Sequence, residues 1–210
     1  MSDTPLVTVA ADGRRLLFVM AAEAEYGPAL QARIVPAMTG VGPIEAAVGT
    51  TAALAELAGG AGLPDLVVSL GSAGSRRCAL GQVYQVSSVA WRDMDASLLG
   101  FIRGVTPFVD HEVAVPLPTP LAAWPTASLS TGADVVGGAG YDAIDADMVD
   151  MESFAVLRAC QRFGVPMVGL RGISDGPGEL TGIGDWKRLL AHLDVALAEA
   201  VDALLAGNGA

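Results

Sequence analysis

Residues 43–74 have the sequence PIEAAVGTTAALAELAGGAGLPDLVVSLGSAG and join a predicted helix to a predicted strand. Proline is favoured in the first turn of a helix and glycine ends helices, so we expect a helix that starts at Pro43 and is stopped by Gly59 and Gly60. The apolar run at 65–70 favours a buried strand. A helix that leads directly into a buried strand is typical of α/β folds. The helix is expected to bury one stripe at helical spacing: Ile44, Ala47, Val48, Thr51 and Leu54.

The same alternation continues along the chain. Five predicted strands are LLFVM (16–20), DLVVSL (65–70), QVYQVSSVAW (82–91), EVAVPL (112–117) and VPMVGLRGIS (165–174). A C-terminal helix capped by Asp185 is expected to bury Trp186, Leu189, Leu190, Leu193, Leu197, Val201 and Leu204. The proline-rich segment 104–126 is expected to form a surface hairpin. We therefore expect one α/β domain over residues 1–210, in which residues 1–15 are an N-terminal extension with at most a short strand.

Composition limits the class of function. Hydrophobic residues make up 52% of the 210 residues and charged residues 17%, yet no apolar run approaches the roughly 20 residues of a membrane helix. A net charge of −11 with only 12 basic residues argues against nucleic acid and favours a small neutral or cationic ligand. The start lacks a signal-peptide pattern and only two cysteines occur, so we expect a cytoplasmic protein. The small share of charged residues predicts that a second copy covers an apolar face, as a homodimer.

Polar residues gather just after the predicted strands, where ligands bind in open α/β sheets. The set comprises Glu23, Glu25, a glycine-rich turn at 71–74, the pair Asp150 and Glu152, Arg171 and Asp175. Each feature alone also has an ordinary structural explanation, as a turn or a solvated first-turn acid. Together the carboxylates favour acid/base chemistry.

Other chemistries lack their motifs. Gly40 and Gly42 match the first half of a dinucleotide-binding fingerprint, but Glu45 stands where the third glycine belongs. The sequence has no Walker loop, HExxH, CxxC or GxSxG motif. We therefore expect neither a metal nor an organic cofactor, and no nucleophilic serine.

Several segments together resemble a known family. AAEAE (21–25), TGVGPIEAA (39–47), LPDLVVSLGSAG (63–74), WRDMDASLLGF (91–101), STGAD (130–134), VDMESFAVLRACQRFGVP (149–166) and LRGISD (170–175) resemble the nucleoside phosphorylase and nucleosidase superfamily. Within it, they are most similar to the 5′-methylthioadenosine/S-adenosylhomocysteine nucleosidase family. The most specific parts are Met151 with Glu152, and Ser174 with Asp175.

The resemblance implies a central mixed sheet flanked by helices and a homodimer that cleaves the N-glycosidic bond of a purine nucleoside without a cofactor. It also implies roles for individual residues. Glu25 would activate the attacking water and Asp175 would protonate N7 of the purine, while Glu152 would bind the ribose hydroxyls. The remaining implied contacts are Met151 against the sugar, Ser72 and Arg171 at the border of the pocket, and Ser174 holding the loop of Asp175. Asp150 is expected to cap or orient the following helix.

Elementary chemistry agrees with those roles. Cleavage builds positive charge on the sugar and negative charge on the base, so anions are needed near the ribose and a proton donor near the base. One departure concerns the base, because Val135 and Val136 stand where the family commonly has a stacking aromatic residue. Tyr141, or a partner subunit, would then have to supply the ring.

Three alternatives stay open. The substrate could be another purine nucleoside, such as futalosine or inosine. Arg76 and Arg77 could instead bind phosphate and make the enzyme a phosphorylase, although Glu25 would repel that anion. The chain could also bind a nucleoside without cleaving it.

Overall fold

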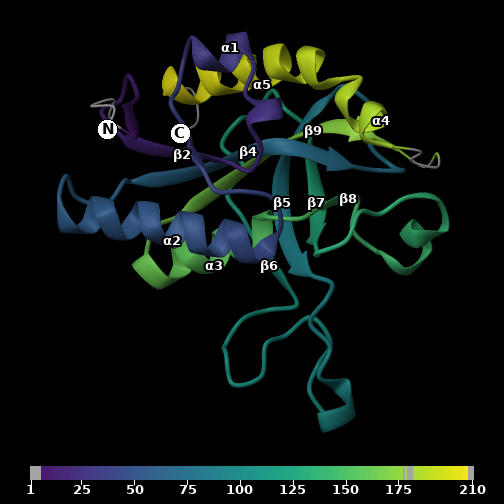
Figure 1. The fold of residues 1–210 in the computed structure, drawn as a ribbon. Coiled ribbons are helices and arrows are strands. Elements are labelled where there is room, and N and C mark those ends of the chain that lie inside the picture. The colour runs from purple at the N-terminus through teal and green to yellow at the C-terminus, as the bar shows by residue number, and fades with distance from the viewer. Residues whose placement is uncertain (1–5, 177, 179–181, 208–210) are drawn as a thin grey trace.

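The computed structural model describes residues 6–176, 178 and 182–207 and shows three layers (Figure 1). Helices α1 (Pro28–Gln31) and α5 (Leu190–Leu205) cover one face of a central sheet. Helices α2 (Pro43–Gly59) and α3 (Ser153–Phe163) cover the other face. The predicted α/β class, with a central mixed sheet flanked by helices, is confirmed.

The sheet has nine strands: β1 (Val7–Val9), β2 (Arg15–Met20), β3 (Ala37–Met38), β4 (Leu66–Gly74), β5 (Val83–Trp91), β6 (Ala114–Pro116), β7 (Thr126–Thr131), β8 (Met148–Asp150) and β9 (Met167–Asp175). Strand β4 pairs in parallel with β2 and β9, whereas β5 pairs with β9 in antiparallel orientation and with β7 in parallel. Strand β8 pairs with β7 and, at Gly74 and Val149, with β4. Five strands thus close into a ring whose strand ends converge.

Alternate residues of β2 supply two separate cores, as expected for a strand covered on both faces. Leu17 and Val19 pack with α2 and α3, while Leu16, Phe18 and Met20 pack with α5. Burial on both faces explains why the strand sequence is apolar without alternation. It also fixes the strand ends rigidly enough to position side chains.

The predicted stripe of α2 is correct for Leu54, which is buried, but wrong for Ile44, Val48 and Thr51, which are exposed. Ile44 is 74% exposed and Val48 is 62% exposed, whereas Ala46, Thr50, Ala53, Leu54 and Leu57 are buried. Small residues allow a close approach, since a Cβ at Gly49 would lie 2.8 Å from the Cα atom of Thr39. The helix therefore packs through its small residues and leaves an apolar ridge outside.

The C-terminal helix is also divided differently from the prediction. A short helix α4 (Ile183–Lys187) precedes α5, so Asp185 lies within α4 instead of capping a longer helix. Leu190, Leu193, Leu197, Val201 and Leu204 are buried as predicted. Trp186 does not belong to this core and reaches the cavity described below.

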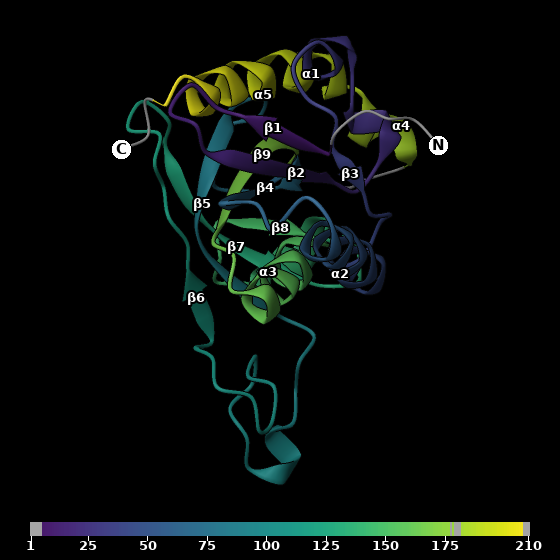
Figure 2. The same ribbon diagram turned by 90° about the vertical axis from the view of Figure 1, so that its left-hand side faces the viewer.

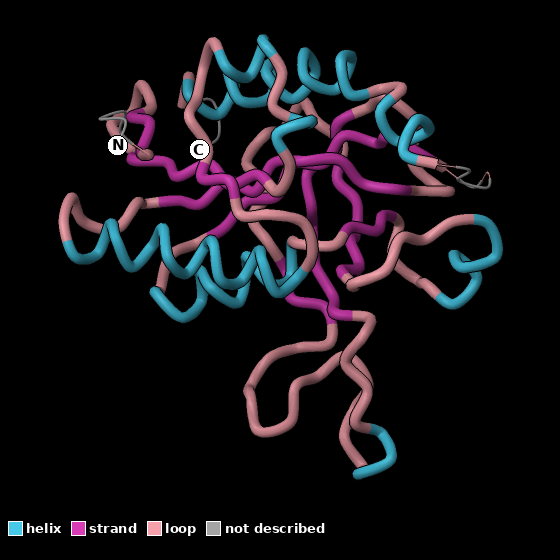
Figure 3. Tube along the Cα trace, in the orientation of Figure 1, coloured by secondary structure: helices cyan, strands magenta, loops and turns pink. Residues whose placement is uncertain are grey.

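A long excursion between β5 and β7 projects from the body of the protein (Figure 2). The predicted hairpin at 104–126 is reduced to the three-residue strand β6, and most of residues 92–113 are loop apart from the turn η2 (Ser97–Leu99) (Figure 3). Within the described residues, no helix is long and apolar enough to cross a bilayer.

Candidate active site

A cavity of about 610 Å³ opens where the strand ends converge. Glu25 from the turn η1 (Glu23–Glu25), Glu152 before α3 and Asp175 at the end of β9 all line it. Glu23 is exposed and does not line it. The structure therefore brings together three carboxylates that lie up to 150 positions apart in the sequence.

Glu25 is buried and held by Ser72 at the end of β4. The backbone N–H of Ser72 donates to Glu25 Oε1 at 2.8 Å, and the Ser72 hydroxyl donates to the same oxygen at 2.5 Å. Burial raises the pKa of Glu25 above its ordinary value, while the two Ser72 hydrogen bonds and the nearby Arg171 charge oppose the rise. Oε2 of Glu25 faces Gly71, where a Cβ would lie only 3.3 Å away.

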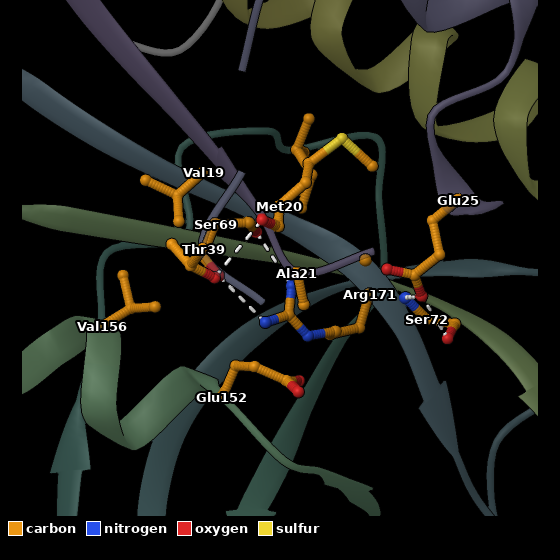
Figure 4. Close-up of a pocket in the computed structure, with 12 residues that line it drawn as sticks. Val19, Met20, Ala21, Glu25, Thr39, Ser69, Ser72, Glu152, Val156 and Arg171 are labelled. Carbon is orange, nitrogen blue, oxygen red and sulfur yellow. Dashed lines mark hydrogen bonds between the residues drawn. The ribbon is translucent and has the colours of Figure 1, made fainter. Parts of the chain in front are cut away.

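A second, much smaller cavity of about 10 Å³ lies beside Glu25 (Figure 4). This volume is close to that needed for one water molecule. Glu25, Ser72, Glu152 and Arg171 are among the residues that line it. A polar cavity of this size next to a carboxylate can hold a water molecule for activation.

The glycine-rich segment at 71–74 is not a turn, contrary to the prediction. It continues β4, and its glycines allow side chains to approach the strand. A Cβ at Gly74 would lie 2.5 Å from the Tyr141 hydroxyl and 2.7 Å from Asp175 Oδ1. The glycines therefore make room for the site.

Glu152 accepts a hydrogen bond of 2.8 Å from the backbone N–H of Gly42 at the start of α2. Gly42 has φ of 96°, which favours glycine, so the TGVG motif serves to present this amide. Burial, together with the neighbouring Asp150 charge, raises the pKa of Glu152 to about 7. The sequence reasoning had found no role for these glycines.

Asp150 orients the start of α3, one of the two predicted roles, by accepting the N–H of Ser153, the first residue of the helix, at 3.0 Å. Its carboxylate also pairs with Arg171 at 3.0 Å, and both side chains are almost fully buried. The remaining Arg171 donors bind Ser69, Leu170 and Ser153. Arg171 thus borders the small cavity with its hydrogen bonds already directed to protein groups.

Asp175 lines the large cavity from the end of β9. The Ser174 hydroxyl donates to Asp175 Oδ2 at 2.7 Å, which orients the carboxyl group. Burial raises the pKa of Asp175 above its ordinary value, although the Ser174 hydrogen bond opposes the rise. A raised pKa keeps the acid protonated closer to neutral pH.

Of the remaining predicted residues, some line the large cavity and others do not. Met151 and Val135 both line the large cavity, and Val135 is 71% exposed. Tyr141 is 3% exposed, packs with Val136 and Val149, and does not line the cavity, so the expectation that its ring stacks on the base is wrong. Arg76 and Arg77 bind Asp142 and Asp147 and do not line the cavity either.

Two residues of the cavity, Trp186 and Arg92, were not predicted from the sequence to lie at the site. The Trp186 indole N–H donates to the Ser72 hydroxyl at 2.9 Å, although the sequence placed Trp186 in a helix core. Arg92, directly after β5, donates to backbone oxygens of Ser130, Asp150 and Asp134 and fixes the loop that carries Val135. Among the described residues, no three His, Cys, Asp or Glu side chains are grouped to hold a metal ion.

Comparison with known proteins identifies the family of this chain. The sequence profile of the phosphorylase superfamily matches residues 21–206. The chain is 30% identical over 165 residues to a 5′-methylthioadenosine/S-adenosylhomocysteine nucleosidase of Actinobacillus succinogenes, covering 70% of each protein. It is 30% identical over 161 residues to the nucleosidase of the same name from Haemophilus influenzae, covering 68% of each.

Solved structures show the same fold. A nucleosidase of this kind from Colwellia psychrerythraea, in complex with adenine, superposes with a TM-score of 0.78 at 20% identity, covering 92% of this chain and 95% of that one. A futalosine hydrolase of Helicobacter pylori superposes with a TM-score of 0.77 at 18% identity, covering 90% and 96%.

The closed mixed sheet and its carboxylate-lined cavity thus define an α/β protein of the nucleoside phosphorylase type. More particularly, the chain belongs to the phosphorylase superfamily and groups there with the 5′-methylthioadenosine/S-adenosylhomocysteine nucleosidases. The resemblance found in the sequence is confirmed.

Proposed function

We propose that this protein is an N-glycosyl hydrolase that cleaves 5′-methylthioadenosine, S-adenosylhomocysteine or both, and releases adenine. One observation carries the proposal: Glu25, Glu152 and Asp175 line one cavity, and a water-sized cavity adjoins Glu25. The sequence similarity to nucleosidases supports the same activity.

The water side of the reaction depends on Glu25. A water molecule in the small cavity would attack C1′ of the ribose while Glu25 takes its proton. Both Ser72 donors bind Oε1, which leaves Oε2 to act as the base. The ionised carboxylate also stabilises the positive charge that develops on the sugar.

The base side depends on Asp175. As the bond from C1′ to the purine nitrogen breaks, its electron pair moves to the base, and the Asp175 proton passes to N7. The raised pKa of Asp175 suits this role. Asp175 is left as a carboxylate and regains a proton before the next turnover.

Glu152 is suited to bind the ribose diol, with Met151 beside it in the same cavity. The Gly42 amide donates to Oε1 of Glu152, and ribose hydroxyls would add further donors. These hydrogen bonds favour the ionised form, which opposes the burial that raises its pKa to about 7.

Val135 and Val136, which stand where the family commonly has a stacking aromatic residue, both line the cavity, so another purine nucleoside is the second candidate substrate. Futalosine and inosine carry hypoxanthine in place of adenine. Phosphorolysis is less well supported, because Arg76 and Arg77 bind acidic partners away from the cavity and the carboxylates around the water site would repel phosphate.

We also infer a homodimer. Val41, Ile44 and Val48 form an exposed apolar ridge at the start of α2, with exposed fractions of 56%, 74% and 62%. Such a ridge is costly in water and favours burial against a second copy. We place the enzyme in the cytoplasm, where its two free cysteines stay reduced, and in methionine salvage.

The deciding experiment supplies the purified protein with 5′-methylthioadenosine, S-adenosylhomocysteine, adenosine, inosine and futalosine, with and without phosphate. Free base is followed by chromatography. We expect adenine from the two thioethers without phosphate, and a loss of roughly 100-fold or more in kcat for Asp175→Asn. Release that requires phosphate would replace hydrolysis by phosphorolysis, and saturable binding without any release would indicate a binding protein.

A further inference from the structure

Tyr141 lies in the short helix η3 (Gly138–Ala143) behind the wall of the large cavity. Its ring packs with Val136 and Val149, and its side chain is 3% exposed. Among the described residues, its hydroxyl is buried without a hydrogen-bond partner. An unsatisfied buried hydroxyl costs free energy, so its presence requires an explanation.

The hydroxyl and the carboxyl group of Asp175 lie beside the same glycine. Tyr141 Oη and Asp175 Oδ1 both approach Gly74, because a Cβ there would lie 2.5 Å from the first atom and 2.7 Å from the second. Any larger residue at position 74 would fill the space that the two oxygens share. Meanwhile Oδ2 of Asp175 accepts a hydrogen bond from Ser174.

We propose that Tyr141 is a positioning residue for the proton donor, and that its hydroxyl donates a hydrogen bond to Asp175 once this carboxyl group has given its proton to the leaving base. The inference rests on the proposed glycosidic cleavage. Before transfer, Asp175 is neutral and gains little from the bond. After transfer it is an anion, and a charge-assisted hydrogen bond then stabilises it.

Each proton is accounted for when Asp175 first protonates the base and Tyr141 then donates a hydrogen bond to the resulting carboxylate. The proton on N7 comes from Asp175, and Tyr141 keeps its own proton throughout. Burial and the nearby Asp175 charge raise the pKa of Tyr141 to about 12, so the phenol donates without ionising. An interaction that strengthens only as charge develops lowers the barrier instead of tightening substrate binding.

Two arginines also lie near this pair. Arg92 and Arg76 both act on Tyr141, but each is already paired, with Asp134 and Asp142 respectively. The Ser174 hydroxyl beside Asp175 is neutral. Tyr141 is therefore the donor best placed to respond to ionisation of Asp175.

The kinetic test compares Tyr141→Phe with the wild type. The variant keeps the ring and removes only the hydroxyl, and Tyr84→Phe on β5 serves as the matched control. We expect kcat to fall roughly 10-fold for Tyr141→Phe with KM nearly unchanged. In an Asp175→Asn background the same change should cost nothing further, since the two groups act together. Unchanged kcat, or a loss that persists in that background, would overturn the proposal.

A second measurement does not depend on turnover. The carboxyl carbon of Asp175 is followed by NMR during a pH titration of the free protein. Loss of a donor to the ionised form should shift the pKa of Asp175 upward in Tyr141→Phe and leave it unchanged in Tyr84→Phe. An identical pKa in all three proteins would refute the interaction, even if the wild type proved to cleave a different nucleoside or none.

Stability separates a structural role from a functional one. If the hydroxyl supports the fold, Tyr141→Phe should lower Tm, and any loss of rate would follow from the loss of stability. If the proposal holds, the variant keeps or gains stability while it loses rate. Such a gain in stability at the expense of activity is expected for a polar group retained for catalysis.

Discussion

Arg171 Nη2 lies 3.0 Å from Asp150 Oδ2, and the two side chains are 2% and 1% exposed. This pair joins β9 to β8 beneath the cavity, and Asp150 also accepts hydrogen bonds from Thr131 and the start of α3. Glu152, two residues later, is positioned by the same segment. The buried pair therefore supports the segment that presents Glu152 to the cavity.

Replacement of one partner should be costly, because it leaves the other charge buried and unpaired. Asp150→Asn is expected to lower the free energy of unfolding by about 3 kcal/mol. Asp142→Asn is the control, since it breaks the more exposed pair with Arg76 and should cost less than about 1 kcal/mol. Urea denaturation measures both, and equal effects would contradict the structural role assigned to the buried pair.

The pH dependence of kcat/KM should be bell-shaped. Glu25 must be ionised to take a proton, so activity falls as the pH drops through its raised pKa. Asp175 must be protonated to donate, so activity falls as the pH rises through its raised pKa. In Asp175→Asn, the residual activity should lose its decline at high pH. A decline that persists in this variant would assign the basic limb to another group.

The hydrogen bond from Trp186 should act on Glu25 through Ser72. An indole N–H only donates, so Ser72 accepts from Trp186 and directs its own hydrogen to Glu25. In Trp186→Phe the Ser72 hydroxyl is free to rotate, which should raise the pKa of Glu25. The charges of Arg171, Asp150 and Glu152 also lie near Glu25 and are unchanged in this variant. The acidic limb of the pH profile should therefore move to higher pH. A change in KM alone would instead indicate that the ring only lines the cavity.

Glu152 should make the wild type less stable as the pH rises. Its pKa is about 7 in the folded protein against 4.5 for an ordinary glutamate, so the folded state holds the proton more tightly. The associated stabilisation is present below about pH 4.5 and is lost as the pH passes through about 7. Glu152→Gln should thus raise Tm at pH 8 and change it little at pH 4, while the exposed Glu56→Gln should show no such trend.

The apolar ridge on α2 offers a test of the homodimer. Ile44→Asp places a charge on this ridge and should convert the dimer to monomers in light scattering. Val195→Asp is the matched control, because Val195 is 51% exposed on α5, which covers the opposite face of the sheet (Figure 1). A dimer that survives Ile44→Asp would place the interface elsewhere.

The sequence by itself determined the order of most helices and strands, the family and the identity of the three carboxylates. These depend on local patterns: apolar runs such as 65–70 must be buried, and Pro43 and Gly59 bound a helix wherever it packs. Strands β7 and β8 were not predicted, because β7 contains several small polar residues and β8 has only three residues.

Only the tertiary structure decided which side chains meet. Ile44 and Val48 were expected in the core, yet the small residues on the other side of α2 allow closer packing and take their place. Trp186 reaches Ser72, and Tyr141 stands behind Asp175, because strands that are distant in sequence close into a ring. The sequence pattern predicts which side of a helix or strand is apolar. Which distant segments come into contact depends instead on how closely their backbones can approach.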